Sequence, residues 1–378
     1  MLIVMRILGG GASASVQAVG AGTIADIWEP QERGRAMSMF YLGPLTGPLF
    51  APIIGGALSQ GFGWESTMWF LTIYGGVTLV MVFFCLPETL AKRKPLVTHA
   101  ALQSSRPGSS ANNEITPHLS RMSTRQSVKQ HTKAGAEFLK RAFIDPLECI
   151  TYLRFPPVAI VVYFAAITFG SLFVLNISTQ SSFSKSPYNF SELIVGLLYL
   201  PSSLGYIGAS FVGGRWIDNI MAREARKAGR YDARGKLIYL PEDRMRENAW
   251  LAATMYPAAL VWFGWTTDRG VHWIVPAIAN FFFGFGSMLV FGAATTMLTE
   301  FMPRKSSSGV ALNNFVRNIF SCVGAIVTQP LINVMGVGWL CTMIAIVCWT
   351  TGNLSIWALK RYGPGWRKSM DAKLSVPS

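Results

Sequence analysis

The chain has 378 residues, of which 51% are hydrophobic, 12% aromatic and only 14% charged, with a formal net charge of +14. Nearly all lysines and arginines stand in loops between long apolar runs, a pattern of membrane topology that argues against nucleic-acid binding. The cysteines lack metal-ligand spacing, and no acid, base and nucleophile can be assembled into an enzyme site. The composition therefore predicts an all-α polytopic membrane protein that is not an enzyme and uses no cofactor or metal.

Three apolar runs in the amino-terminal part are long enough to cross a bilayer: Met1–Ile24, Met37–Leu58 and Trp69–Leu86. Arg6 and Gln17 lie inside the first of them. A charged side chain within a span is costly, so Arg6 is a candidate functional residue. The alternative is that Arg6 extends to the nearer membrane interface.

The second run contains the sequence GPLTGPLFAPIIGG, in which a small residue followed by proline recurs every four residues. Its members are Gly43, Pro44, Gly47, Pro48, Ala51, Pro52, Gly55 and Gly56. Internal prolines disrupt a water-soluble helix but are tolerated in membrane helices, where neighbouring groups satisfy the freed carbonyls. Because the small residues form a stripe without bulk, another helix can approach closely. The motif predicts a hinge in a protein that changes shape; a tightly packed, kinked helix is the alternative.

A polar stretch over residues 92–133 predicts a disordered linker, and the basic, apolar segment Ala134–Phe155 predicts a helix on the membrane surface. Six more apolar runs follow: Val158–Ile177, Leu193–Val212, Ala249–Trp265, Val271–Met297, Val310–Asn333 and Trp339–Leu359. We therefore expect a partial membrane half at 1–87, a cytoplasmic linker with an interfacial helix at 88–156, a second membrane half at 157–362 and a cytoplasmic tail at 363–378.

Polar residues gather on one face of the run Val310–Asn333, where Asn314, Arg317 and Asn318 are followed by Ser321 and Thr328. Such a stripe should face a neighbouring helix or a water-filled cavity, and hydrogen bonding between helices is the simpler reading. The candidates for a substrate cavity are Gln17, Tyr163, Phe164, Tyr199, Asn280, Asn314, Arg317 and Asn318. No aspartate or glutamate lies deep in any predicted span, so the sequence names no acidic proton carrier.

The motif at residues 43–56 resembles the antiporter signature on the fifth span of drug:proton antiporters in the major facilitator superfamily, with Ala51-Pro52 in place of one Gly-Pro pair. Arg6 and the three glycines at 9–11 resemble the fourth-span motif, which implies that Arg6 faces the cavity and assists proton movement. The segments Leu237–Trp250 and Ala311–Trp339 look like fungal multidrug exporters of the quinidine-resistance subgroup.

A further segment, Gly213–Asp218, resembles the loop signature of the superfamily. We expect Asp218 to pair with Arg33 or Arg35 across the two halves, as a latch on the cytoplasmic side.

The resemblance implies a major facilitator fold that begins at the fourth of twelve spans, so that the first three are missing and about nine remain. It also implies a monomeric fungal transporter in plasma-membrane lipid that exports small amphiphiles in exchange for protons, by alternating access. Two alternatives stay open. One is a metabolite or sugar facilitator, and the other is a truncated remnant that transports nothing.

Overall fold

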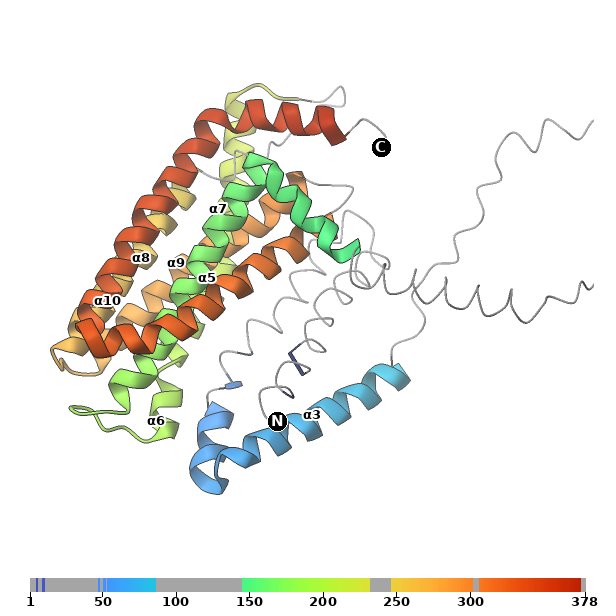
Figure 1. The fold of residues 1–378 in the computed structure, drawn as a ribbon. Coiled ribbons are helices and arrows are strands. Elements are labelled where there is room, and N and C mark those ends of the chain that lie inside the picture. Colours follow the sequence, from blue (N-terminus) through green and yellow to red (C-terminus); the bar gives the residue numbers. More distant parts are fainter. Residues whose placement is uncertain are drawn as a thin grey trace, which may run out of the picture.

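A computed structural model describes residues 5, 9–10, 47, 50–51, 53–85, 145–231, 246–301 and 306–374. The regular elements of this part are helices, as predicted (Figure 1). They are α3 (Trp64–Cys85), the 3-10 helix η2 (Asp145–Arg154), α5 (Pro156–Phe183), α6 (Glu192–Leu197), α7 (Leu200–Lys227), α8 (Glu247–Asp268), α9 (Ile274–Phe301) and α10 (Ser306–Leu374).

Five helical segments of the described chain are long and apolar enough to cross a membrane: Trp64–Cys85, Pro156–Phe183, Glu192–Gly213, Ile274–Leu298 and Ser308–Arg367. The last of these holds two of the predicted spans, because Gly336 interrupts α10 with φ 79° and ψ 167°. Glycine reaches this region of positive φ without a steric penalty. Figure 1 shows the two arms of α10, in dark orange and red, diverging from their junction.

The predicted span Ala249–Trp265 lies within α8, which is not among those five segments. Polar residues stand at both ends of α8, from Glu247 to Asp268, and α8 packs between α9 and α10. Because half of its side chains are buried against other helices, α8 needs less apolar surface than a lipid-exposed helix. The total of nine spans stays a prediction.

Helices in the bundle cross where both carry glycine. A Cβ atom on Gly324 of α10 would lie 2.9 Å from the Gly170 carbonyl oxygen of α5, and one on Gly170 would lie 3.2 Å from the Phe320 carbonyl oxygen. The α7–α9 crossing is built in the same way from Gly205 and Gly284. Such close approach of backbones is typical of membrane helices, which associate through van der Waals packing at small residues rather than through the hydrophobic effect.

The first arm of α10 has two different faces. Apolar side chains on one face are exposed, among them Phe315, Ile319 and Val323. On the other face Ser321 and Thr328 are buried, and Arg317 is half-buried. These members of the predicted polar stripe therefore point toward the bundle, as expected of polar groups that avoid lipid, whereas Asn318 is exposed.

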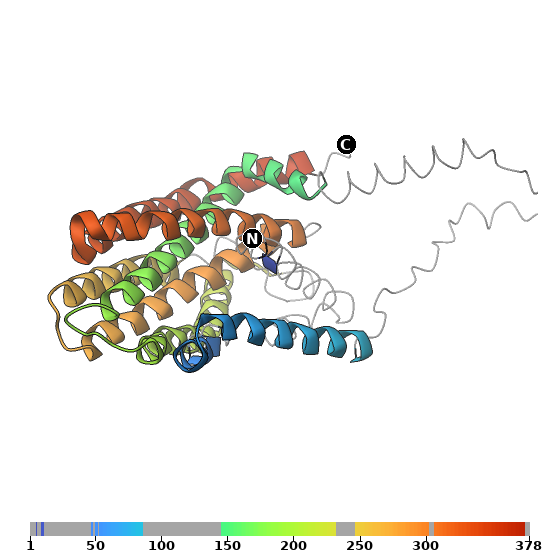
Figure 2. The same cartoon turned by 60° about the horizontal axis from the view of Figure 1, so that its bottom comes forward.

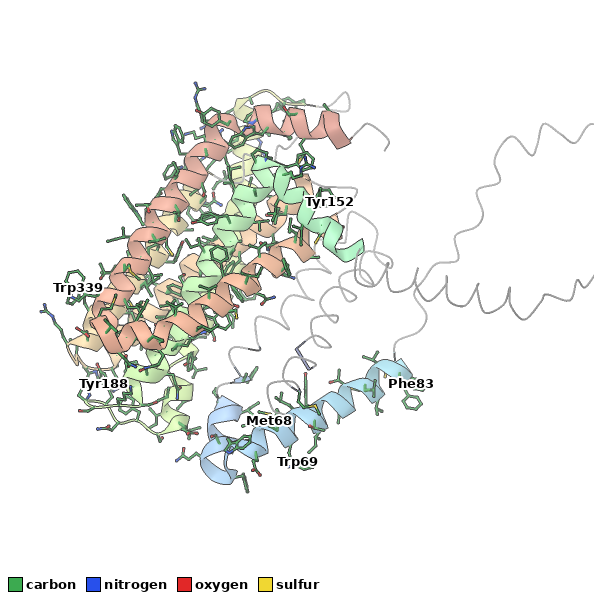
Figure 3. All side chains as sticks on the ribbon, viewed as in Figure 1. Met68, Trp69, Phe83, Tyr152, Tyr188 and Trp339 are labelled. Carbon is green, nitrogen blue, oxygen red and sulfur yellow. The ribbon has the colours of Figure 1, made fainter. Side chains whose placement is uncertain are left out.

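Helix α3 stands apart from this bundle in both views (Figures 1 and 2). None of its residues is buried, and large apolar side chains such as Trp69 and Phe83 are exposed along it (Figure 3). Its mean hydropathy is that of a membrane span, so lipid is a suitable surrounding for these side chains.

The two ends of the second half differ in detail from the sequence prediction. The end of the predicted surface helix is the 3-10 helix η2, which packs against α5 and α10. The expected tail at 363–378 instead continues α10 as far as Leu374, and Met370 in this extension is buried. Most of the predicted linker lies outside the described residues. The boundaries of the expected domains stay predictions.

Candidate functional site

Arg317 of α10 is held between two aromatic rings from different helices. Its guanidinium carbon lies 4.1 Å from the ring centre of Phe169 in α5 and 4.6 Å from that of Phe291 in α9. The two rings are 5.9 Å apart at an interplanar angle of 72°. Both are close enough for cation–π attraction, which is strongest where water is excluded. The structure thus braces a cation at the meeting point of α5, α9 and α10.

The three residues occupy a similar depth in the bundle. Arg317 stands roughly 16 Å along α10 from Ser306, at the usual helical rise. Phe169 stands about 20 Å from the start of α5, and Phe291 about 15 Å from the end of α9, which runs in the opposite direction. The cation therefore lies well inside the apolar part of the bundle rather than at an end.

A buried hydroxyl lies within electrostatic range of Arg317. It belongs to Tyr206 of α7, which is 6% exposed. Ser287 of α9 is its neighbour but donates to the Gly284 carbonyl oxygen at 3.1 Å. By distance and angle, the Tyr206 oxygen has no hydrogen-bond partner among the described residues. A guanidinium and a phenolic hydroxyl, both hydrogen-bond donors, are thus brought into the same region of the bundle.

The remaining polar residues of the α10 stripe behave in different ways. Asn314 is half-buried and Asn318 is exposed. Ser321 donates to the Asn318 carbonyl oxygen at 2.9 Å, and Thr328 donates to the Gly324 carbonyl oxygen. These two hydroxyls bond within their own helix, so their hydrogen bonds do not link α10 to a neighbour.

Two of the aromatic candidates are part of the packing. Phe164 is 1% exposed, and its ring lies 3.0 Å from where a Cβ on Gly352 would stand. This places Phe164 in the core between α5 and the second arm of α10, and its role in a substrate cavity stays a prediction. Tyr163 is half-buried, with its ring 5.9 Å from that of Phe320.

Asn280 of α9 is 2% exposed, and its side-chain oxygen has no hydrogen-bond partner among the described residues. An unsatisfied buried amide is costly, which keeps Asn280 a candidate for ligand binding. It lies about 16 Å from Phe291 along α9, so the structure does not bring it next to Arg317.

A cavity of about 310 Å³ lies where the amino-terminal part meets the second half. Its lining is formed by Gly55, Gly56, Ser59, Gln180, Glu192, Gly196 and Tyr199. The Tyr199 hydroxyl donates to the Asn176 carbonyl oxygen at 2.9 Å, which fixes the ring at the cavity wall. Tyr199 therefore lies in the wall of this cavity, at the end of the bundle where α6 begins, and its contact with substrate stays a prediction.

The last glycine of the proline-containing motif makes the close approach. A Cβ on Gly56 would lie 2.9 Å from the Glu192 carbonyl oxygen and 3.1 Å from the Leu193 Cα. By contrast, no described atom lies within 4 Å of such a Cβ on Gly47 or Gly55, and Ala51 is exposed. Among the described members of the motif, contact with the second half is therefore made at Gly56.

Several predicted site residues cannot be placed. Those outside the described part of the chain are Arg6, Gln17, Arg33, Arg35, Gly43, Pro44, Pro48 and Pro52. Asp218 lies in the backbone of α7, but its side chain is not described. The latch and the role of Arg6 stay predictions. Sequence reasoning missed Phe169, Phe291 and Tyr206, because nothing distinguishes them from the other aromatic residues of apolar runs.

Ion pairs join the end of α7 to the start of α8. Arg223 lies 2.9 Å from Glu247, and Arg246 lies 3.5 Å from Glu224. The hydrogen bond to Glu247 is the main reason that the pKa of Arg223 is raised. These charges are part-exposed beyond the apolar section of α7, so they connect the two helices outside the membrane-spanning part.

Comparison with known proteins gives the family. Residues 1–325 match the family model described as Major Facilitator Superfamily. The chain belongs to this superfamily. Over 95% of its length it is 48% identical to the MFS transporter OpS2 of Beauveria bassiana, covering 98% of that protein. Over 98% of its length it is 33% identical to the MFS antiporter QDR3 of Candida albicans, and 29% identical to quinidine resistance protein 3 of Saccharomyces cerevisiae.

The chain spans 66% of the Candida antiporter and 70% of the Saccharomyces protein. The predicted resemblance to fungal drug:proton antiporters is confirmed by these matches, as is the prediction of a transporter rather than an enzyme. This member of the major facilitator superfamily is an integral membrane protein and a secondary transporter of small molecules. How many spans the whole protein has stays a prediction.

Proposed function

We propose that this facilitator exports small amphiphiles in exchange for protons, by alternating access between its two halves. The contact of Gly56 with the start of α6 carries the proposal, because here the backbones of the two parts approach each other closely. The cavity beside it, lined by residues of both parts, gives the junction room to open. The names of two relatives, an antiporter and a quinidine resistance protein, support export as the direction of transport.

Alternating access requires one half to rock against the other around a site near the middle of the membrane. Gly56 brings two backbones together without interlocking side chains, which suits a contact that is made and broken in each cycle. We propose that the proline-containing run forms the hinge of this movement.

The test is transport by the purified chain in lipid vesicles with an imposed pH gradient. Fluorescent amphiphiles of positive, neutral and negative charge are loaded on one side, and their movement is followed with and without a protonophore. We expect gradient-dependent movement of at least one probe, and none in vesicles without protein.

Each alternative gives a different result. Movement that is unchanged when the gradient is collapsed would favour the metabolite or sugar facilitator and contradict proton coupling. A correctly folded protein that moves no probe under any gradient would favour the remnant that transports nothing.

We further propose that the linker and the carboxyl terminus are cytoplasmic and that the loop between α5 and α6 is external. This orientation follows from the position of the basic loops. A cysteine replacing the exposed Ser184 should react with an impermeant thiol reagent in intact cells, whereas one placed in the 92–133 linker should not. The reverse pattern would contradict the orientation, and with it a cytoplasmic latch between Asp218 and Arg33 or Arg35.

A further inference from the structure

We propose that the carboxyl-terminal end of α10 carries a binding site for the head group of an anionic phospholipid. The site is a surface on which basic and aromatic side chains stand together, and we call it the basic–aromatic surface. Its members are Trp357, Lys360, Arg361, Tyr362 and Trp366. The proposal concerns the lipid around the protein and not its substrate, so it stands independently of export.

The end of α10 has one buried side and one exposed side. Ile356 and Leu359 are almost completely buried, whereas Trp357 is 50% exposed and Tyr362 is 48% exposed. Figure 1 shows this end of α10, in red, turning at the end of the bundle and running across it. Pro364 lies in this part of the helix, and proline is a usual cause of a bend. Large rings are thus presented outward at the end of a membrane helix.

The rings of the basic–aromatic surface form a continuous row. The ring centre of Tyr362 lies 5.9 Å from that of Trp357 and 5.4 Å from that of Trp366. The guanidinium carbon of Arg361 lies 6.0 Å from the centre of the Tyr362 ring. Tryptophan and tyrosine are typical of the membrane interface, where their rings lie at the level of the head groups. The row therefore places Arg361 at the depth of the lipid head groups.

The charges at this end of α10 have one sign. From Trp357 to Met370 the sequence contains four basic residues and no aspartate or glutamate. Lys360 and Arg361 are exposed, and neither forms an ion pair with an acidic side chain of the described residues. Arg223, by contrast, is paired with Glu247. The charges of Lys360 and Arg361 are therefore complementary to an anion that the surroundings supply.

Two features favour a lipid over a soluble anion as the occupant. The segment Ser308–Arg367 is long and apolar enough to cross a membrane, and the basic–aromatic surface lies at its end. Its exposed rings also need an apolar partner, which a soluble anion does not offer. A phospholipid meets both conditions, because its charged head group binds the cations while its glycerol and upper acyl chains pack against the rings. Anionic lipids of the cytoplasmic leaflet attract basic residues in this way.

The experiment measures lipid binding to the delipidated full chain in detergent by native mass spectrometry. The probes are dioleoylphosphatidylserine, dioleoylphosphatidylcholine and the soluble head group glycerophosphoserine. The two lipids share their acyl chains and differ in net charge. We expect the first phosphatidylserine to bind at least about fivefold more tightly than phosphatidylcholine, the factor typical of one basic residue near an anionic lipid. Equal affinities for the two lipids would overturn the proposal, as would glycerophosphoserine that binds as tightly as the whole lipid.

Substitution of the two cations locates the site. The double variant Lys360→Gln, Arg361→Gln should lose the preference for phosphatidylserine and keep its affinity for phosphatidylcholine. The matched control is Lys185→Gln, Arg269→Gln, which removes two exposed basic residues from the loops that follow α5 and α8. The thermal midpoint in the same detergent verifies that each variant is folded. An unchanged preference in the folded Lys360, Arg361 variant, or an equal loss in the control, would overturn the assignment to this surface.

Substitution of a ring tests whether the occupant is a whole lipid. Trp357→Ala should weaken the binding of both lipids, because the ring contacts the part of the molecule that they share. The ratio of the two affinities should stay as in the parent, since both cations remain. Unchanged binding of both lipids to this variant would contradict the packing of the lipid against the row of rings.

Discussion

Replacing Gly56 by alanine tests whether the junction between the halves opens and closes. The new methyl group would lie 2.9 Å from the Glu192 carbonyl oxygen and 3.1 Å from the Leu193 Cα. Both are backbone atoms, so neither can turn aside as a flexible side chain would. Overpacking of this kind costs about 1–3 kcal/mol. The cost applies only while the junction is closed, because a parted junction has room for the methyl group.

The substitution should therefore shift the population toward the state in which the two parts separate at this end. A penalty of about 1–3 kcal/mol changes an equilibrium constant by roughly fivefold to 150-fold. Alanine also favours a helix over glycine by up to about 1 kcal/mol, and this effect must be separated from the clash. Gly55→Ala provides the control, since it makes the same change one residue earlier, where no described atom lies within 4 Å.

The assay uses a cysteine in place of Ser59, which lines the cavity beside the junction. Its rate of labelling by an impermeant maleimide is measured in the parent, in Gly56→Ala and in Gly55→Ala, and the labelling of the native cysteines is subtracted. We expect labelling to be faster in Gly56→Ala than in the parent, and to be unchanged in Gly55→Ala. Equal rates in both alanine variants would refute the argument that this contact limits opening.

Three other predictions concern the described helices. Gly336→Ala should lower the free energy of unfolding of the purified protein by about 1–2 kcal/mol, and with it the thermal midpoint, because φ is 79° at this position. Gly365→Ala is the control: it lies in open helical surroundings and should not lower the thermal midpoint. Arg223→Glu should lower the thermal midpoint at low salt, and adding Glu247→Arg should restore it, if their 2.9 Å pair connects α7 and α8; no recovery would contradict this. The Tyr188 hydroxyl donates a hydrogen bond to the Val271 carbonyl oxygen, and burial raises the pKa of this hydroxyl. The bond therefore stabilises the fold below the ordinary pKa of 10.0, and this stabilisation is lost as pH rises through the raised value. Tyr188→Phe should therefore cost about 1 kcal/mol at neutral pH and reduce the alkaline loss of stability; an unchanged alkaline profile would contradict it.

The positions of the helices could be predicted because an apolar run of about twenty residues has few alternatives to a membrane helix. The run Val310–Asn333 is an example, since it falls within the first arm of α10 and the buried members of its polar stripe point into the bundle. The small residues of the proline-containing motif predicted a close helix approach along the stripe Gly43, Gly47, Ala51 and Gly55, and this stays a prediction. The close approach in the described part of the motif is at Gly56 instead, and it depends on where α6 begins, which no local pattern encodes.

The partners of Arg317 could not be predicted, because they come from helices far apart in sequence. Phe169 and Phe291 are separated by three helices, and both resemble the aromatic residues that only fill space. Phe164, which the sequence offered as a cavity candidate, lies on the face of α5 toward Gly352, where a glycine makes room for its ring. Choosing between neighbouring aromatic residues requires the rotation of each helix about its axis, which is set by packing.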